Sequence, residues 1–326
     1  MSDQISDDSN ETIKLTSAGK SPFDDMYTLL KTLPKADTCS GNKVREDLGK
    51  KPLGGQGGRL TELAVWLAEW QGNPEPKLDE CHICVLASSY KEGMASDSLK
   101  AFMSLAASGQ SSVNRLCVPN GVGLRVLEMA LEMPHVLGDW DRASVMAAAA
   151  FGMEATAAGG DLLGLGDLAF GNEVSSIAIL CRLLNIETSE FAMGVGLHAS
   201  AEQASKLLRA NNENDPLEIL IPFGGREMAA AIGAIIAARS RRLPVVLDGW
   251  SASVAAVILW KIEPSSIAHC VLASSLNDAH GRAMAKTGLK PILDLSLDTG
   301  MGTGSAMTVG VLSAALSLLE LPSMQD

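Results

Sequence analysis

The stretch Pro291–Ser305, PILDLSLDTGMGTGS, joins an apolar strand pattern to a loop with glycine at three alternate positions. A helical pattern follows it, from Ala306 towards Leu319. Glycines let backbone N–H groups approach a ligand closely, and the start of a helix adds a partial positive charge. The stretch therefore predicts a strand–loop–helix unit of an α/β fold, with the loop as a candidate anion site. Met301, in the middle of that loop, can neither carry charge nor transfer a proton.

Units of the same kind fill most of the chain. The short apolar runs predicted as strands are His82–Ser88, Leu124–Glu128, Leu162–Leu165, Leu243–Leu247, His269–Ala273 and Ile292–Leu295. The helical patterns are Arg59–Trp70, Ser98–Ala107, Ser111–Leu116, Arg142–Thr156, Val174–Leu184, Ala201–Ala210, Arg226–Ser240, Ser251–Lys261 and Ala279–Thr287. This alternation predicts an α/β fold with a mostly parallel sheet flanked by helices, and ligands at the carboxyl ends of its strands.

Composition narrows the class of protein. The formal net charge of the 326 residues is −12, which argues against general nucleic-acid binding. The first twenty residues show no signal-peptide pattern, and the apolar run Met228–Ala238 is too short to span a bilayer. We therefore expect a cytoplasmic protein that binds neither nucleic acid nor membrane. The pair Cys81 and Cys84 has CxxC spacing but no second Cys/His pair, so buried strand thiols are favoured over a metal or redox site.

Three loops that follow strand patterns could hold a ligand. They are residues 163–173, residues 246–250 and the loop of Pro291–Ser305. Each alone could be a tight turn, but three together favour a functional edge of the sheet. A Walker lysine is missing and the spacing does not fit GxGxxG, so we expect neither a nucleoside triphosphate nor a dinucleotide.

A fourth glycine-rich segment, Met193–His198, precedes Lys206. This lysine could reach a phosphate as a mobile charge, or it could simply be a solvated helix residue. His198 and His280 are candidate acid–base groups by residue type only, and structural roles are the alternative for both.

Five segments carry a family resemblance, in order from about residue 50 to 315. Lys51–Ala64 reads KPLGGQGGRLTELA, Gly166–Asn172 reads GDLAFGN, and Gly224–Ala230 reads GGREMAA. Pro244–Gly249 reads PVVLDG, and Leu293–Ser305 reads LDLSLDTGMGTGS. They resemble the KPxGSLGxLExLA, GEMGIGN, GGxExAA, PVLLDG and LDLxLRLGEGTGA segments of the nicotinate-nucleotide:dimethylbenzimidazole phosphoribosyltransferases.

The resemblance implies a fold, a reaction and a partner. Besides the α/β domain it implies a small helical subdomain formed by the terminal regions. The polar, acidic composition of residues 1–20 predicts a disordered tail. After it we expect the N-terminal helical part over 21–80, a Rossmann-like domain over 81–305 and a C-terminal helix over 306–326. Within 23–48 we expect one helix and a loop. Family members are homodimers that move phosphoribose from nicotinate mononucleotide to the base that becomes the lower ligand of cobalamin, and no metal or organic cofactor is implied.

The resemblance also assigns site residues. Met301 occupies the position of the family's catalytic glutamate, with Asp298 or Asp167 as candidate substitutes. Ser88 and Ala101 occupy base-binding positions. The nucleotide-binding positions are Asp167, Gly171, Asn172, Gly194, Gly196, Lys206, Asp248, Gly249, Gly300, Gly302 and Thr303.

The departures from the family pattern fall at positions that the resemblance assigns to catalysis and ligand binding. A thioether at position 301 cannot act as a general base, and Glu173 replaces a threonine at a helix start, where its carboxylate competes with a phosphate for N–H groups. Two hypotheses follow. One is an active phosphoribosyltransferase of altered base specificity. The other is a non-catalytic paralogue that binds a nucleotide or base, or serves as the partner of an active sister chain in a mixed dimer.

Overall fold

A six-stranded parallel sheet organises the computed structural model, which describes residues 21–52, 57–91, 93, 96–295, 297 and 300–324. In spatial order its strands are β2 (Gly123–Glu128), β1 (Cys81–Ala87), β3 (Leu162–Leu168), β4 (Val245–Leu247), β5 (Cys270–Ser274) and β6 (Pro291–Leu293). All pairings are parallel. The predicted α/β fold is confirmed, and every predicted strand is present with its ends shifted by a few residues.

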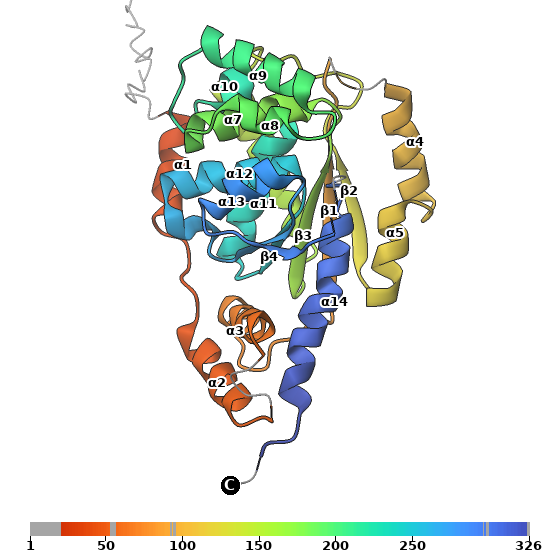
Figure 1. The fold of residues 1–326 in the computed structure, drawn as a ribbon, viewed down its shortest axis with the longest axis vertical. Coiled ribbons are helices and arrows are strands. Elements are labelled where there is room, and N and C mark those ends of the chain that lie inside the picture. The colour runs from red at the N-terminus through yellow and green to blue at the C-terminus, as the bar shows by residue number, and fades with distance from the viewer. Residues whose placement is uncertain are drawn as a thin grey trace, which may run out of the picture.

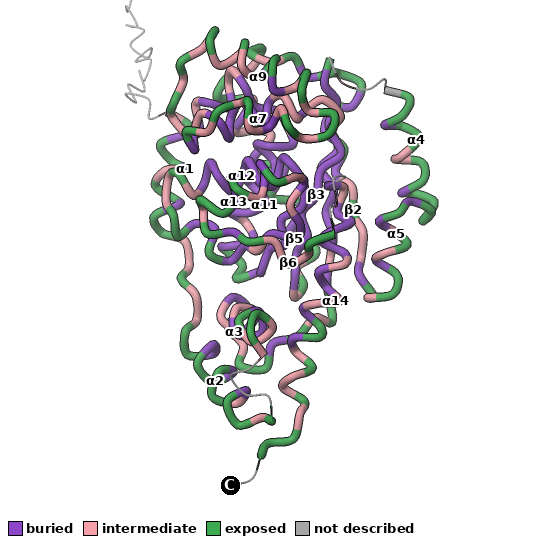
Figure 2. Tube along the Cα trace, viewed as in Figure 1, coloured by how far each residue is buried: buried purple, intermediate pink, exposed green. Residues whose placement is uncertain are grey.

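Side chains of the central strands alternate between two helical layers, as the period of a strand requires. Cys84 and Leu86 of β1 join the core under α6 (Arg142–Gly152), α7 (Asn172–Leu184), α11 (Arg226–Ser240) and α12 (Trp250–Ile262). Cys81, Ile83 and Val85 join the opposite core, under α3 (Arg59–Gln71), α5 (Ser112–Cys117) and α14 (Thr303–Ser317). Figure 2 shows both cores as the buried centre of the molecule. The two thiols of the CxxC spacing thus face opposite sides of the sheet.

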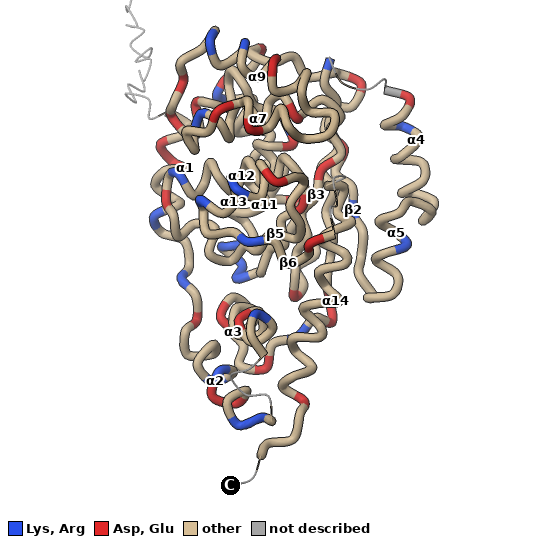
Figure 3. Tube along the Cα trace, viewed as in Figure 1, with Lys and Arg blue, Asp and Glu red and all other residues tan. Residues whose placement is uncertain are grey.

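The remaining helices lie around these layers. They are α1 (Pro22–Leu30), α2 (Thr38–Gly49), α4 (Ser96–Ala107), α8 (Thr188–Ala192), α9 (His198–Ala210), α10 (Leu220–Phe223) and α13 (Asp278–Ala285). In Figure 1, α2, α3 and the end of α14 form a helical part at one end of the sheet. Figure 3 shows the basic residues dispersed among acidic ones over the outer helices and loops, rather than gathered on one element.

The N-terminal region differs from the expected helix and loop. It forms two helices, each with a side-chain cap: Ser21 makes a capping box at α1, and Asp37 accepts from backbone amides at the start of α2. Phe23, Met26 and Leu30 of α1 pack into the α/β core rather than with α2 and α3. The proposed domain limits stay a prediction, and the predicted tail over 1–20 lies outside the described residues.

Helix α14 is unusually apolar. Together with the turn that follows, Thr303–Glu320 is long and apolar enough to cross a membrane by length and composition alone. In this fold, however, Ala306, Val309 and Leu312 are fully buried or nearly so against the sheet. Its apolar composition is therefore accounted for by core packing.

Candidate active site

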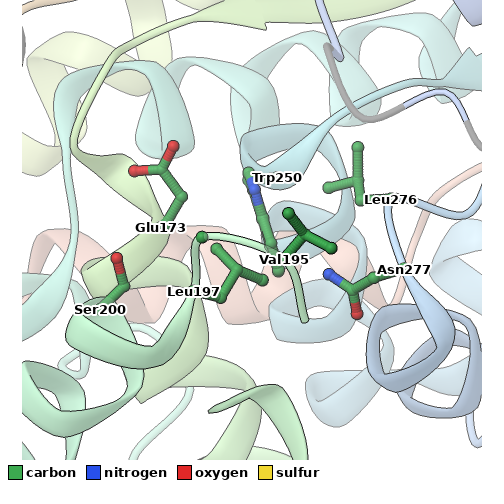
Figure 4. Close-up of a pocket in the computed structure, with 8 residues that line it drawn as sticks. Glu173, Val195, Leu197, Ser200, Trp250, Leu276 and Asn277 are labelled. Atoms are coloured by element: carbon green, nitrogen blue, oxygen red, sulfur yellow. The ribbon is translucent and has the colours of Figure 1, made fainter. Parts of the chain in front are cut away.

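A cleft lies over the carboxyl ends of the central strands. Its inner chamber, of about 260 Å³, is lined by the loop after β3, by Trp250 and Leu276, and by Gly300 and Met301. Its outer chamber, of about 580 Å³, adds Ser200 and Asn277 and residues 195–197. The two chambers share Glu173, Trp250 and Leu276, so they adjoin as one cleft. Figure 4 shows the residues of the outer chamber.

Asp167 is the buried carboxyl group of the inner chamber. It lies near the end of β3 with its side chain towards α7 and α12, where Asn172 Nδ2 donates to Oδ2 at 2.7 Å and the Ser251 N–H donates to Oδ1 at 3.1 Å. Burial, with the negative charge of Glu227 next in effect, raises the pKa of Asp167 to about 8. A carboxyl group in this state is a stronger proton acceptor than an ordinary aspartate once it is ionised.

Glu227 forms a second buried carboxyl group behind Asp167. It stands in the first turn of α11, and the Tyr90 hydroxyl donates to its Oε1 at 2.6 Å. Burial raises the pKa of Glu227, while the hydrogen bond from Tyr90 lowers it. Burial and the neighbouring Glu227 both raise the pKa of Tyr90 as well, so the phenol stays protonated as the donor.

The loop after β6 crosses the ends of β3 and β4 with backbone against backbone. A Cβ on Gly300 would stand 2.6 Å from the Cα of Gly249, and Gly300 has a φ of +59°. The Asp248 carboxylate accepts from the Ser305 N–H at 3.1 Å and also from the amides of Gly302 and Gly304. Burial raises the pKa of Asp248 to about 6, although the hydrogen bonds from these three amides lower it. Asp248 therefore caps α14, and these loop amides already have an acceptor.

Glu173 makes a comparable contact at the start of α7. Its Oε2 accepts from the Gly171 N–H at 3.1 Å, so the carboxylate turns back onto the helix start rather than away from it. Glu173 also lines both chambers. A phosphate placed at this helix start would meet both an occupied donor and a negative charge.

Comparison with known proteins places the chain in a family. A phosphoribosyltransferase family model matches residues 34–325. The nicotinate-nucleotide–dimethylbenzimidazole phosphoribosyltransferases of Brucella melitensis biotype 2 and Brucella canis are each 35% identical over 324 residues, covering 92% of this chain and 94% of theirs. The chain belongs to the nicotinate-nucleotide–dimethylbenzimidazole phosphoribosyltransferase family. The crystal structure of the family's protein from Thermus thermophilus has the same fold, with a TM-score of 0.76 at 23% identity, over 88% of this chain and 97% of that one.

Several of the site residues expected from the family pattern line the cleft of this family member. The predicted residues among the lining are Asp167, Asn172, Gly196, Gly300 and Met301. The half-buried Met301 also packs against the core under α14. A sulfur side chain thus stands beside Asp167 where the family pattern has a carboxylate.

Other expected site residues have different surroundings. Lys206 is not among the described lining residues, and Ala101 is exposed on α4. Ser88 is buried at the end of β1, beside Glu227. Asp298 lies outside the described residues. The other predicted positions stand at the loops and helix starts around the cleft and are not among its described lining residues: Gly171, Gly194, Asp248, Gly249, Gly302 and Thr303.

Both candidate histidines make contacts typical of residues with a structural role. His280 is fully buried, its Nε2 lies 2.9 Å from Ser253 Oγ, and burial lowers its pKa to about 4. Its ring stands edge-on to Trp250 at 5.3 Å. His198 is exposed and lies 3.5 Å from the Glu202 carboxylate. Neither ring is among the described lining residues.

Sequence reasoning placed Trp250 in a candidate ligand loop, residues 246–250, but missed three other lining side chains: Ser200, Leu276 and Asn277. Trp250 begins α12 directly after the glycine that ends the β4 loop. Asn277 caps α13 by accepting from the His280 N–H at 2.9 Å. The position of Trp250 immediately beyond a strand end was the readable signal.

Proposed function

We propose that this family member transfers a phosphoribosyl group from nicotinate mononucleotide to an aromatic base, in cobalamin lower-ligand synthesis, with Asp167 as the proton acceptor. The observation that carries the proposal is that Asp167 and Met301 line the same inner chamber. The thioether cannot take a proton, but the adjacent carboxyl group can. The nicotinate-mononucleotide donor and the base are assigned from the family.

The proposed step is a displacement at the anomeric carbon. The bond from C1′ to the pyridine nitrogen breaks, and its electron pair stays on that nitrogen. A nitrogen of the acceptor base forms the new bond to C1′, and the proton it loses passes to Asp167. Asn172 and the Ser251 amide hold the carboxylate in place, and a general base of this kind typically contributes roughly 10²–10⁴-fold.

The test is nicotinate release from nicotinate mononucleotide with a panel of benzimidazoles, purines and phenols. Because Asp167 must be ionised to accept a proton, we expect the rate to rise with pH and to level off above the pKa of about 8. Asp167→Asn should lower kcat by about 100-fold and remove the rise. Glu62→Gln, which removes a charge on α3, is the matched control. A wild-type rate that is independent of pH, or an Asp167→Asn variant of unchanged rate, would contradict the proposal.

A second candidate function is a non-catalytic binding or partner role in a homodimer or mixed dimer. The thioether of Met301 among the lining residues favours it, because the chamber lacks a base at that position. This role predicts that the chain binds an aromatic base by calorimetry yet releases no nicotinate with any member of the panel. Turnover by the chain purified alone would count against it.

A further inference from the structure

Trp250 and Leu276 form an apolar wall that lines both chambers of the cleft. They come from different segments, because Trp250 begins α12 and Leu276 stands in the turn between β5 and α13. Figure 4 shows Trp250 in the middle of the outer chamber, with Leu276 to one side. A flat apolar wall suits an aromatic ring. Since the same wall lines the inner chamber with Asp167, a base that packs on it lies beside that carboxyl group.

His280 lies behind this wall and contacts both of its parts. It is fully buried in the first turn of α13. Its ring stands edge-on to the Trp250 indole, with 5.3 Å between the ring centres and 80° between the planes. The Leu276 N–H donates to His280 Nδ1 at 3.3 Å. One side chain thus joins two wall residues that are far apart in the sequence.

The hydrogen bonds around His280 define which ring nitrogen carries the proton. The Ser253 hydroxyl donates to the Gly249 carbonyl oxygen at 2.7 Å, since a carbonyl oxygen can only accept. The Ser253 oxygen, 2.9 Å from His280 Nε2, therefore accepts from Nε2–H. Nδ1 is then unprotonated and free to accept from Leu276. Burial lowers the pKa of His280 to about 4, so the ring is neutral near pH 7, as this arrangement requires.

This chain of hydrogen bonds ends at the residue that precedes Trp250. Gly249 has a φ of +96°, and a Cβ there would meet the Asp167 carboxylate. The ring contacts of Trp250 are with His280 and with Phe191, whose ring centre lies 6.1 Å away. His280 therefore restrains the indole directly and, through Ser253, the backbone from which it projects.

We propose that His280 is a positioning residue of the acceptor site, which holds Trp250 and Leu276 as the wall against which the aromatic acceptor base packs. The inference rests on the base site of the transfer proposed above and adds a residue to it. His280 is not among the described lining residues and acts through the wall. Because the wall contacts the base both before and during the reaction, loosening it raises KM for the base and leaves kcat nearly unchanged.

The test measures benzimidazole binding by calorimetry. His280→Ala removes both wall contacts and should weaken benzimidazole binding by about 10-fold, the scale of one aromatic packing contact. His280→Asn should lose less, because its amide oxygen can take the place of Nδ1 for the Leu276 N–H. In the assay of nicotinate release, KM for benzimidazole should rise in step with the loss of affinity, while kcat stays within about twofold.

His269→Gln is the matched control. His269 is also fully buried, its Nε2 lies 3.0 Å from the Ile235 carbonyl oxygen, and its ring centre is 5.7 Å from that of Trp70. It directly precedes β5, so it stands at the end of the sheet opposite the cleft. His269→Gln should lower the midpoint of thermal unfolding, as the His280 variants do, but leave benzimidazole affinity unchanged.

The outcomes separate this inference from the proposed transfer. Unchanged benzimidazole affinity in folded His280→Ala, an equal loss in His269→Gln, or no binding by the wild-type chain overturns it. Where His280→Ala does not fold, Ser253→Ala removes the acceptor of Nε2 and keeps the ring, and it should weaken binding by about 3-fold. Unchanged affinity there overturns the inference equally. Benzimidazole binding that depends on His280, without nicotinate release, would overturn the transfer alone.

Discussion

The loops after β3 and β6 meet at one edge of the sheet, and each presents a helix start to a carboxylate. Asp248 is buried and accepts from three amides of the β6 loop and α14. Glu173 is half-exposed, accepts from one amide two residues away and faces the cleft. The same type of contact is thus buried in one loop and faces the cleft in the other. Burial and the number of donors make the difference.

The largest effect is expected from a change in the loop after β6. Met301→Glu places a proton acceptor at the position where the thioether stands. In an Asp167→Asn background, which lacks the proposed proton acceptor, we expect Met301→Glu to raise the rate of nicotinate release by about 100-fold, since a general base contributes on that scale. Met301→Gln, of similar shape without basicity, is the control and should not gain. In the wild-type background, where Asp167 already accepts the proton, the gain should be smaller. If Met301→Glu still binds the aromatic acceptor base but shows no gain in the rate of nicotinate release, the chamber lacks more than a proton acceptor at position 301.

Removing the buried cap should cost stability. Asp248→Ala leaves three amides at the start of α14 without their acceptor, and we expect the free energy of unfolding to fall by about 3 kcal/mol in chemical denaturation. Asp248→Asn keeps an acceptor oxygen and should lose less. Equal stability of wild type and Asp248→Ala would show that the cap is dispensable.

The smallest effect on stability is expected at the half-exposed carboxylate. In Glu173→Gln the amide oxygen can still accept from Gly171, so the free energy of unfolding should change by no more than about 0.5 kcal/mol. The measurement is the same denaturation curve, run beside Asp248→Ala. A loss as large as that of the buried cap would remove the distinction between the two loops.

The strands were predictable from sequence, but their order was not. Short runs of Val, Ile and Leu mark each strand locally, whereas the placement of β1 between β2 and β3 depends on crossover connections. The two N-terminal helices were readable from their caps at Ser21 and Asp37, although apolar periodicity alone suggested one. Caps are local chemistry and add information that periodicity lacks.

The position of the candidate site was predictable from the sequence, but the directions in which its side chains point were less so. The strand-end rule brought Asp167 and Met301 to one chamber. Side-chain direction could have been read from strand parity, since Asp167 faces α7 and α12 while Asp248 faces α14. The turn of Glu173 back onto Gly171 depends on a side-chain torsion that no sequence pattern specifies. The role of Trp250 required knowing which helices enclose the cleft.

The glycine contacts between loops also have a consequence for engineering. Gly249 and Gly300 meet without any intervening side chain, so a methyl group at Gly300 would collide with the facing backbone. Met301 sits between Gly300 and Gly302 on this rigid frame, yet its own side chain is half-exposed to the cleft. A saturation library at position 301 would therefore sample catalytic chemistries on a fixed backbone, while a library at the flanking glycines would mainly sample misfolding.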